Sequence, residues 1–242
     1  MSTHQKALIA LETCTPVGGV SLYLQGRGVA ESIVVDSPRA QSVEIAQAVK
    51  TLMQQYTLDW SEIAAIAVST GPGSFTGVRL GLSLAKGICL TGTPRLIEVS
   101  TLKALAWRSL PLLKNQQHVI PLFNAKKGEV YGQVFQLNAE CLSPVTKPFV
   151  ALVEDFSRIF KAFPNALFTG AGCVEYHVQI LNEALGCSFA SKDILHPHPE
   201  TVALLGWEKF KNQEFSDPAN VGPFYLRDAS VSTPKKIRST PV

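Results

Sequence analysis

The sequence has few charged residues, no long hydrophobic run and no cysteine pair of the CxxC kind. Only 17% of its 242 residues are charged, against roughly 25% in an average soluble domain. No apolar run approaches ~18 residues without a charge, and the apolar stretch near the N-terminus is much shorter than that of a secretory signal. We therefore expect a soluble, cytoplasmic protein with no membrane contact, and a chain long enough to bury a core.

Motifs for metal, nucleophile and nucleotide sites are also missing from the sequence. The five cysteines are odd in number and widely spaced, which argues against a disulfide framework or a zinc site. The histidines form no HxxxH or HExxH pair, and the sequence contains neither a GK[ST] loop ending nor a GxSxG elbow. We therefore expect no metal ligands and no catalytic residue in this chain.

The formal charge of +3, from 22 Lys and Arg against 19 Asp and Glu, is small. Such a balance does not make RNA or a membrane the default partner, so any such contact has to come from a local patch. Two short basic segments are candidates, the turn with Lys126 and Lys127 and the polar tail with Lys235, Lys236 and Arg238. Lysines in a turn are more often simply solvated.

The order of the expected elements predicts an α/β protein. In the first half, strands at 7–12, 19–24 and 29–35 precede a helix at 41–56, a strand at 63–69, a helix at 76–90, a strand at 95–99 and a helix at 101–110. The second half repeats this order less clearly, with strands at 119–123, 130–137 and 142–150, a helix at 153–163, a strand at 166–169 and helices at 174–185 and 201–211. Each half thus has the order βββαβα followed by a further helix.

Two copies of this unit predict two duplicated lobes with a cleft between them. We place the lobes at 1–112 and 113–233, followed by a basic tail at 234–242. The arrangement resembles the actin-like ATPase (ASKHA) fold of actin, Hsp70 and the sugar kinases. The duplication is inferred from the order of elements, because the two halves share no residue-level repeat.

The strongest local signal is the segment STGPGSFTGVR at 69–79, a glycine-rich turn between a buried strand and a helix. Glycines allow close backbone approach, a hydroxyl can cap the helix, and free N–H groups at its start suit an anion. A carboxylate at the end of the first strand could hold magnesium near phosphates. The candidate phosphate or nucleotide residues are Glu12, Thr13, Gly71, Gly73, Ser74 and Thr76. A tight turn that binds nothing and an ordinary strand-end carboxylate remain the alternatives.

Apolar and small residues cover roughly 200° of the helix at 76–90, against about 100° for a surface helix that covers one core. Small residues at four-residue spacing would also let another backbone approach closely. Because a large apolar patch usually marks an interface, we predict a docking face made with the helix at 41–56. The predicted interface residues are Gly77, Val78, Gly81, Leu82, Ala85, Cys89, Ala46 and Met53. A central helix buried within its own chain is the alternative.

With GPGSFTGVR at 71–79, the sequence resembles the TsaB (YeaZ) family. Supporting segments are GEVY at 128–131, VSTLKALA at 99–106 and PFYLR at 223–227. The resemblance implies an actin-like ATPase fold and a noncatalytic role beside TsaD, the subunit that transfers the threonylcarbamoyl group. The product is N6-threonylcarbamoyladenosine at position 37 of tRNAs that read codons beginning with A.

The resemblance also implies partners and cofactors. It implies a heterodimer with a TsaD-type subunit, contact with a TsaE-type ATPase and with tRNA through the complex, and a homodimer as an option without the partner. ATP and a metal are expected on the partner subunits, and none on this chain. Where TsaD-type chains carry a metal-binding HxxxH, this chain has STLKA at 100–104, and Asn124 stands where the family usually has Asp.

Two other functions remain open. A stand-alone kinase or hydrolase of the same fold would use the cleft between the lobes, and it would need a magnesium-nucleotide site that Asn124 does not favour. A direct tRNA-binding module would use the lysines at 126–127 and the basic tail. Such binding draws on several phosphate contacts, which the small net charge disfavours.

Overall fold

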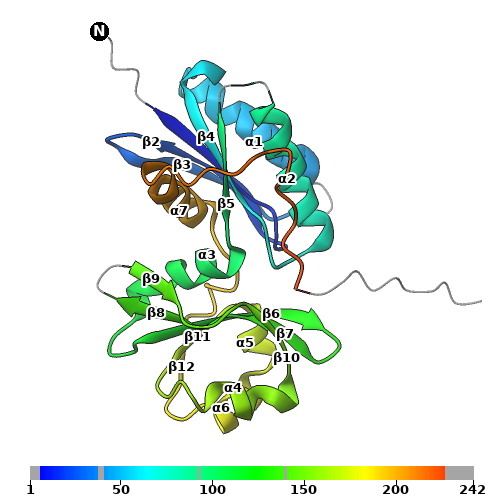
Figure 1. The fold of residues 1–242 in the computed structure, drawn as a ribbon, viewed down its shortest axis with the longest axis vertical. Helices are drawn as coiled ribbons and strands as arrows, with labels where there is room; N and C mark the ends of the chain where they lie inside the picture. The colour runs from blue at the N-terminus through cyan, green and yellow to red at the C-terminus, as the bar shows by residue number, and fades with distance from the viewer. Residues whose placement is uncertain (1–5, 38–40, 91, 93, 139–140, 227–242) are drawn as a thin grey trace, which may run out of the picture.

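The protein folds as two α/β lobes, one above the other in Figure 1. The computed structural model describes residues 6–37, 41–90, 92, 94–138 and 141–226. The elements of the first lobe are β1 (Ala7–Glu12), β2 (Gly18–Leu24), β3 (Gly28–Val35), α1 (Gln41–Gln55), β4 (Ile63–Ser69), α2 (Phe75–Cys89), β5 (Arg95–Val99) and α3 (Thr101–Arg108). These bounds confirm the predicted strands and helices of the first half to within two residues.

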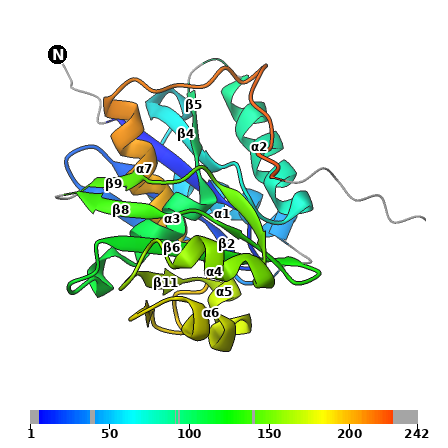
Figure 2. The same cartoon turned by 60° about the horizontal axis from the view of Figure 1, so that its bottom comes forward.

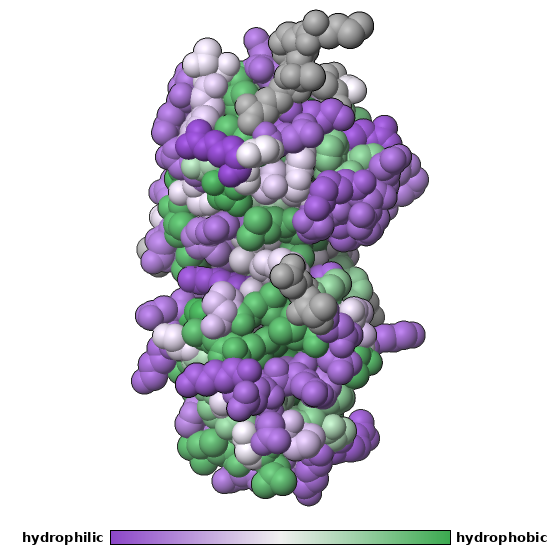
Figure 3. Space-filling view, turned by 90° about the vertical axis from the view of Figure 1, so that its left-hand side faces the viewer, coloured by the Kyte–Doolittle hydropathy of each residue, from purple (hydrophilic) through white to green (hydrophobic). Residues whose placement is uncertain are grey.

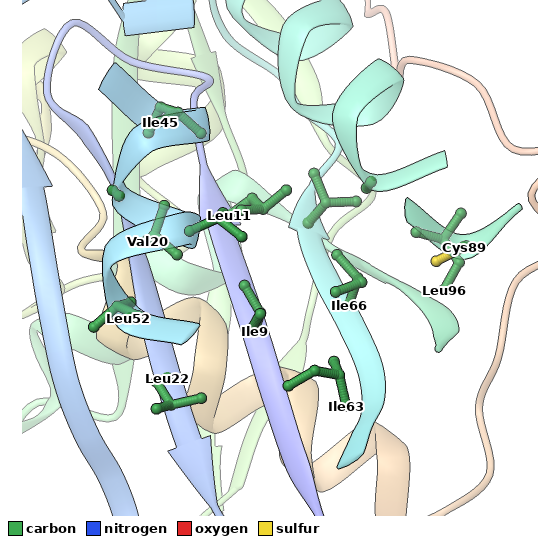
Figure 4. Packing of buried hydrophobic residues seen from close by; sticks show 14 of the residues in the cluster. Ile9, Leu11, Val20, Leu22, Ile45, Leu52, Ile63, Ile66, Cys89 and Leu96 are labelled. Atoms are coloured by element: carbon green, nitrogen blue, oxygen red, sulfur yellow. The ribbon is translucent and has the colours of Figure 1, made fainter. Parts of the chain in front are cut away.

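The first sheet has the strand order β3-β2-β1-β4-β5 and is covered by helices on both faces. Strand β1 pairs antiparallel with β2 and parallel with β4. Its side chains alternate: Ile9 and Leu11 pack toward α1 and α2, whereas Leu8 and Ala10 pack toward the opposite helix layer. A strand buried on both faces reads as a continuous apolar run, as β1 does. Figure 4 shows the first of these two cores.

The second sheet repeats the strand order of the first. Its main path is β10-β7-β6-β11-β12, with β7 antiparallel to β6 and to β10, and β11 parallel to β6 and to β12. Read in chain order, both sheets have the order third, second, first, fourth, fifth, and the same strand directions. The structure therefore confirms the duplicated βββαβα arrangement and the actin-like fold. The elements are β6 (His118–Lys126), β7 (Glu129–Gly132), β8 (Phe135–Asn138), β9 (Cys141–Pro144), β10 (Phe149–Leu152), α4 (Phe156–Phe160), β11 (Leu167–Thr169), α5 (Ala171–Glu175), α6 (His177–Glu183), β12 (Ser188–Phe189) and α7 (Pro199–Lys211).

The last helix of each half packs on the other half. Helix α3 lies against β6 of the second lobe, and α7 lies against β1 and β2 of the first lobe. The close approach of α7 needs Gly206, because a Cβ there would lie 2.5 Å from the Cβ of Ala67. The predicted range of the second lobe included α7, which the structure packs on the first sheet. Hydrophobic periodicity shows that a helix has an apolar face, but not which sheet that face covers.

Several second-half elements are shorter than predicted. The expected strand at 130–137 is two strands, β7 and β8, which bend apart at Gln133 and Val134. Polar groups at the bend are paired with Thr146, which accepts hydrogen bonds from the Gln133 side chain and the Val134 N–H. The strand at 142–150 is likewise β9 and β10, and the helix at 174–185 is α5 and α6. The apolar alternation continues across these bends, so periodicity alone does not reveal them.

The surface mixes polar and apolar residues. Figure 3 views the side of the molecule opposite to the β6–β7 turn and shows separate hydrophobic patches with hydrophilic residues between them. Scattered exposed apolar side chains are normal on soluble proteins. Among the described residues, no helix combines the length and the hydrophobicity that crossing a membrane requires.

Candidate functional site

The glycine-rich loop between β4 and α2 packs against the chain that follows β1. The N–H of Ser74 donates to the carbonyl oxygen of Cys14 at 2.7 Å, and the Ser74 hydroxyl accepts from the N–H of Gly77. A Cβ on Gly73 would lie 2.3 Å from the Cys14 carbonyl oxygen. Gly71 adopts a φ of +114°, which favours glycine. The structure thus places the predicted residues of the glycine-rich loop beside the end of β1. Ser74 caps helix α2, and Thr76 is exposed beside it.

Glu12 has a buried carboxylate that other parts of the chain already bind. One of its oxygens accepts from the N–H of Cys14 at 2.7 Å, and the other accepts from the hydroxyl of Ser69. Burial raises the pKa of Glu12 to about 7, although hydrogen bonds from Ser69 and from the backbone of Cys14 and Thr15 lower it in part. Because the side chain has no exposed surface, it does not open toward a cleft.

Thr13, the other strand-end candidate, is buried against α2. Its hydroxyl donates to the carbonyl oxygen of Gly77 at 2.7 Å. A Cβ on Gly77 would lie 2.0 Å from the Thr13 carbonyl oxygen, and one on Gly81 would lie 2.3 Å from the Thr13 hydroxyl. The glycines at four-residue spacing therefore leave space for the chain's own loop after β1. They are not a contact surface for a second backbone.

Most of the predicted interface residues lie in the core of the first lobe. Those on α2 point into the core because α2 packs on β4 and on the end of β1. The buried residues are Gly77, Val78, Gly81, Leu82, Ala85, Cys89 and Met53. Of the eight predicted residues, only Ala46 is exposed. The broad apolar sweep of α2 thus reflects burial within the chain, and the assignment of its six predicted residues as exposed docking residues is corrected.

A groove lies between α1 and α2, and most of the residues that line it are apolar. It encloses a volume of about 390 Å³. Ala46 and Met53 of the predicted set line it, together with Leu84, Ile88 and Trp60. Lys50 and Asp59 add charge to its lining. The two helices of the predicted docking face flank this groove, but the residues predicted on α2 lie on its buried side and not on the side that carries Leu84 and Ile88.

The segment after α7 runs back across the first lobe to the start of α2 (Figure 1). Ser216 forms a bridge with Leu96 of β5, Val221 is buried in the core, and the N–H of Phe224 donates to the carbonyl oxygen of Thr70. The ring of Tyr225 stacks on that of Phe75, with centroids 5.2 Å apart. We call residues 213–226 the strap. PFYLR at 223–227 was the only sequence signal of it, and its position against the glycine-rich loop could not be read from that motif.

The second lobe contributes the β6–β7 turn and a separate cavity. Asn124 forms hydrogen bonds within the second lobe. Its side chain donates to the Glu175 carboxylate and accepts from the N–H of Lys126. Lys126 and Lys127 are exposed, and both have positive φ angles. The cavity has about 290 Å³ and is lined by Phe168, Thr169, Gly170, Cys173, Val174, His177, Phe189, Ala190, Ser191, Lys192, Ile194 and Leu195. None of the predicted site residues lines it.

The chain is similar to proteins of threonylcarbamoyladenosine biosynthesis. The family model described as "TsaD: tRNA N6-adenosine threonylcarbamoyltransferase" matches residues 35–233. The Escherichia coli protein named tRNA threonylcarbamoyladenosine biosynthesis protein TsaB is 32% identical, over 91% of this chain and 94% of that protein. The Bacillus subtilis protein of the same name is 28% identical, over 91% of this chain and 93% of that protein.

A solved structure shares the whole architecture. The protein described as YeaZ from Pseudomonas aeruginosa superposes with a TM-score of 0.79 at 25% identity, covering 91% of this chain and all of that one. The likeness therefore extends over both lobes and includes the helix pair that forms the groove.

Proposed function

Because the chain belongs to the TsaB (YeaZ) family, we propose that it takes part in forming N6-threonylcarbamoyladenosine at position 37 of tRNAs that read codons beginning with A. In this proposal it is the noncatalytic partner of a TsaD-type subunit, to which it docks through the groove between α1 and α2. The observation that carries the docking proposal is the groove itself, an apolar surface between two helices that stays accessible after the chain has buried its own core.

The family match indicates what kind of surface the partner presents. A model built for TsaD matches 35–233 of this chain, so a TsaD-type subunit shares the fold and has a corresponding helix pair. Two related chains that meet through the same helix pair form a nearly symmetric interface, as identical subunits do across a twofold axis. The same geometry accounts for a homodimer when the partner is missing.

A noncatalytic role is supported by how the candidate residues are used. The Glu12 carboxylate binds Ser69 and the Cys14 N–H, and Asn124 offers an uncharged amide where the family usually has a carboxylate. A magnesium-nucleotide site needs oxygen ligands that are free to bind the ion. We therefore place ATP and the metal on the TsaD-type and TsaE-type subunits of a cytoplasmic complex, which the tRNA joins.

Docking is tested with neighbouring residues on the two helices. Leu84→Glu and Ala46→Glu put a carboxylate into the groove, where an unpaired charge buried by the partner is costly. Ser83→Glu and Gln47→Glu make the same change at exposed positions outside the groove lining. We expect the first pair to abolish co-purification with the TsaD-type subunit and the second pair to retain it. Equal retention by all four variants would contradict the docking surface.

The role in modification is tested by reconstitution. Purified TsaD-type and TsaE-type subunits, a threonylcarbamoyl donor, ATP and tRNA are combined with and without this chain, and the modified nucleoside is measured by mass spectrometry. We expect modification to depend on the chain and to be lost with Leu84→Glu. Full activity without the chain would overturn the proposed function.

A further inference from the structure

The outward face of α5 and α6 is apolar. Two hydrogen bonds, from the N–H of Tyr176 to the carbonyl oxygen of Gly172 and from the N–H of Ile180 to that of Tyr176, continue the helical pattern across the junction of the two helices. Side chains three and four residues apart therefore share one face. Four large apolar side chains on this face are each at least half exposed. We call them the seam: Val174 is 54% exposed, Val178 64%, Leu181 50% and Leu185 78%.

The second lobe does not use the seam for its own packing. A surface helix normally has one apolar stripe, which covers the core, and a further exposed patch of this kind marks an interface. In both Figure 1 and Figure 2, α6 lies at the lower edge of the molecule, well away from α1 and α2. The residues of these helices that do cover the core are Cys173, Tyr176, Ile180 and Ala184.

The spacing of the seam residues fits another helix. Successive members are 4, 3 and 4 residues apart, which is the alternation of a and d positions in a coiled coil. The order valine, valine, leucine, leucine is also self-complementary when two copies lie antiparallel. Val174 then lies opposite Leu185 of the second copy. Val178 lies opposite Leu181 of the second copy, so every layer contains one valine and one leucine.

The side chains that flank the seam also suit a second copy. Glu175 follows Val174 and Asn182 follows Leu181, so both flank it on the same side. In the antiparallel pair Glu175 lies opposite Asn182 of the second copy, and a carboxylate meets an amide that donates to it. On the other side His177 lies opposite the uncharged Ala184. No like charges therefore face each other across the pair.

We propose that the seam joins two copies of this chain as an antiparallel helix pair. A twofold contact uses the same surface on both copies, as the self-complementary pattern requires. Because α5 and α6 are short, the contact is smaller than a standard protein interface, and the dimer forms reversibly as the concentration rises. The groove between α1 and α2 lies in the other lobe, so the inference does not rest on the proposed function.

Self-association is measured by sedimentation equilibrium of the full chain from micromolar to millimolar concentration. The Leu84→Glu chain is used, with Ala46→Glu as a second choice, because either change removes self-contact through the groove. Its molar mass should rise from 26.2 kDa toward twice that value. A chain that stays monomeric at every concentration in both backgrounds would overturn the inference.

The seam is tested in the same chain with charged substitutions. Val178→Glu and Leu181→Lys should each keep the molar mass at 26.2 kDa, because dimerisation would bury an unpaired charge. Both positions are exposed, and thermal melting checks that each variant is folded. The matched control is Val145→Lys, at a 44% exposed apolar position of the second lobe outside the seam. It should still dimerise, and an equal loss there would contradict the assignment.

The antiparallel register is tested by mixing variants. In a mixture of Val178→Glu with Leu181→Lys, the two new charges lie opposite each other, so the mixture should dimerise more than about tenfold more tightly than either variant alone. A mixture of Val178→Glu with Val178→Lys also combines opposite charges, but the antiparallel pair does not place them in one layer. It should stay monomeric. Equal recovery in both mixtures would show that charge attraction alone is at work, and the inference would be wrong.

The seam and the groove fail in different ways. Val178→Glu in the otherwise unchanged chain should keep its binding to the TsaD-type subunit, whereas Leu84→Glu should lose it. If Val178→Glu instead loses another subunit or tRNA modification, while the Leu84→Glu chain is monomeric with or without it, the seam binds a different protein. That outcome overturns the self-contact and leaves the proposed function standing.

Discussion

The hydroxyl of Thr13 donates a hydrogen bond to the carbonyl oxygen of Gly77, 2.7 Å away, across the contact between the end of β1 and α2. Both residues are buried. This contact explains why α2 carries glycines where a helix ordinarily avoids them: the side chain that a larger residue would add has no space beside Thr13. Glycine in a helix interior costs about 1 kcal/mol relative to alanine, and here the close packing offsets that cost.

Gly77→Ala should destabilise the protein. The new Cβ would lie 2.0 Å from the backbone oxygen of Thr13, so the helix or the loop must move. Overpacking of this kind costs about 1 to 3 kcal/mol. Chemical denaturation measures the loss, and an unchanged midpoint would show that the contact is not tight.

Gly87→Ala is the matched control in the same helix. Nothing lies within 4 Å of a Cβ at Gly87, and the residue is exposed. Because alanine has the higher helix propensity, this variant should raise the free energy of unfolding by up to about 1 kcal/mol. The two substitutions are chemically identical, so opposite effects on the free energy of unfolding would come from the contact with Thr13.

Leu82 and Leu90 should separate burial from docking. Leu82 is 3% exposed in the core of the first lobe, and Leu90 is 78% exposed at the end of α2. Leu82→Ala should lower the free energy of unfolding by about 2 to 5 kcal/mol, and Leu90→Ala by about 0.5 kcal/mol or less. A charged residue at position 82 therefore unfolds the lobe and says nothing about partner binding. Equal costs for the two alanine variants would contradict the inward orientation of α2.

The sequence predicted the first lobe closely because β1, β2 and β4 are buried on both faces and its helices have clear apolar periodicity. Strand β1, for example, has the predicted bounds Ala7–Glu12. The second lobe has shorter elements that bend at points such as Gln133 and Tyr176. Alternation of apolar residues continues through such bends, and it is the change of partner strand or helix axis that ends an element.

The sequence predicted which segments form the candidate site, but not which way the apolar face of α2 points. The apolar sweep of α2 has two physical explanations, a partner or the chain's own core, and a helical wheel does not distinguish them. The contacts at Gly81 and Thr13 decide for the core. The strap was missed because Tyr225 and Phe75 are far apart in sequence, and only the fold brings their rings together.

The buried Glu12 should make stability depend on pH. Its pKa is raised from 4.5 to about 7 in the folded protein, so the native state holds a proton that the unfolded chain releases. The contribution is fully present below pH 4.5 and is lost as the pH rises through 7. From the size of the shift it amounts to roughly 3 kcal/mol.

Glu12→Gln tests this linkage by removing the ionisable group at nearly the same size. The variant should lose the decrease in stability between pH 4.5 and 7 and be more stable than the parent chain at pH 8. Glu44→Gln, at an exposed position of α1, reports the effect of simply removing one charge. Urea denaturation over a pH series measures all three proteins. An unchanged slope in Glu12→Gln would place the titrating group elsewhere.

The isolated chain should not bind magnesium ATP with measurable heat. The Glu12 oxygens are held by the Ser69 hydroxyl and the Cys14 N–H, and Asn124 supplies no charge at the start of the second lobe. Freeing Glu12 for an ion would break two hydrogen bonds to a buried carboxylate, and each charged hydrogen bond contributes about 1.5 to 3 kcal/mol. Isothermal titration calorimetry checks this. Tight binding with turnover by the isolated chain would instead support the stand-alone enzyme, because a nucleotide site would then have to exist without the partner.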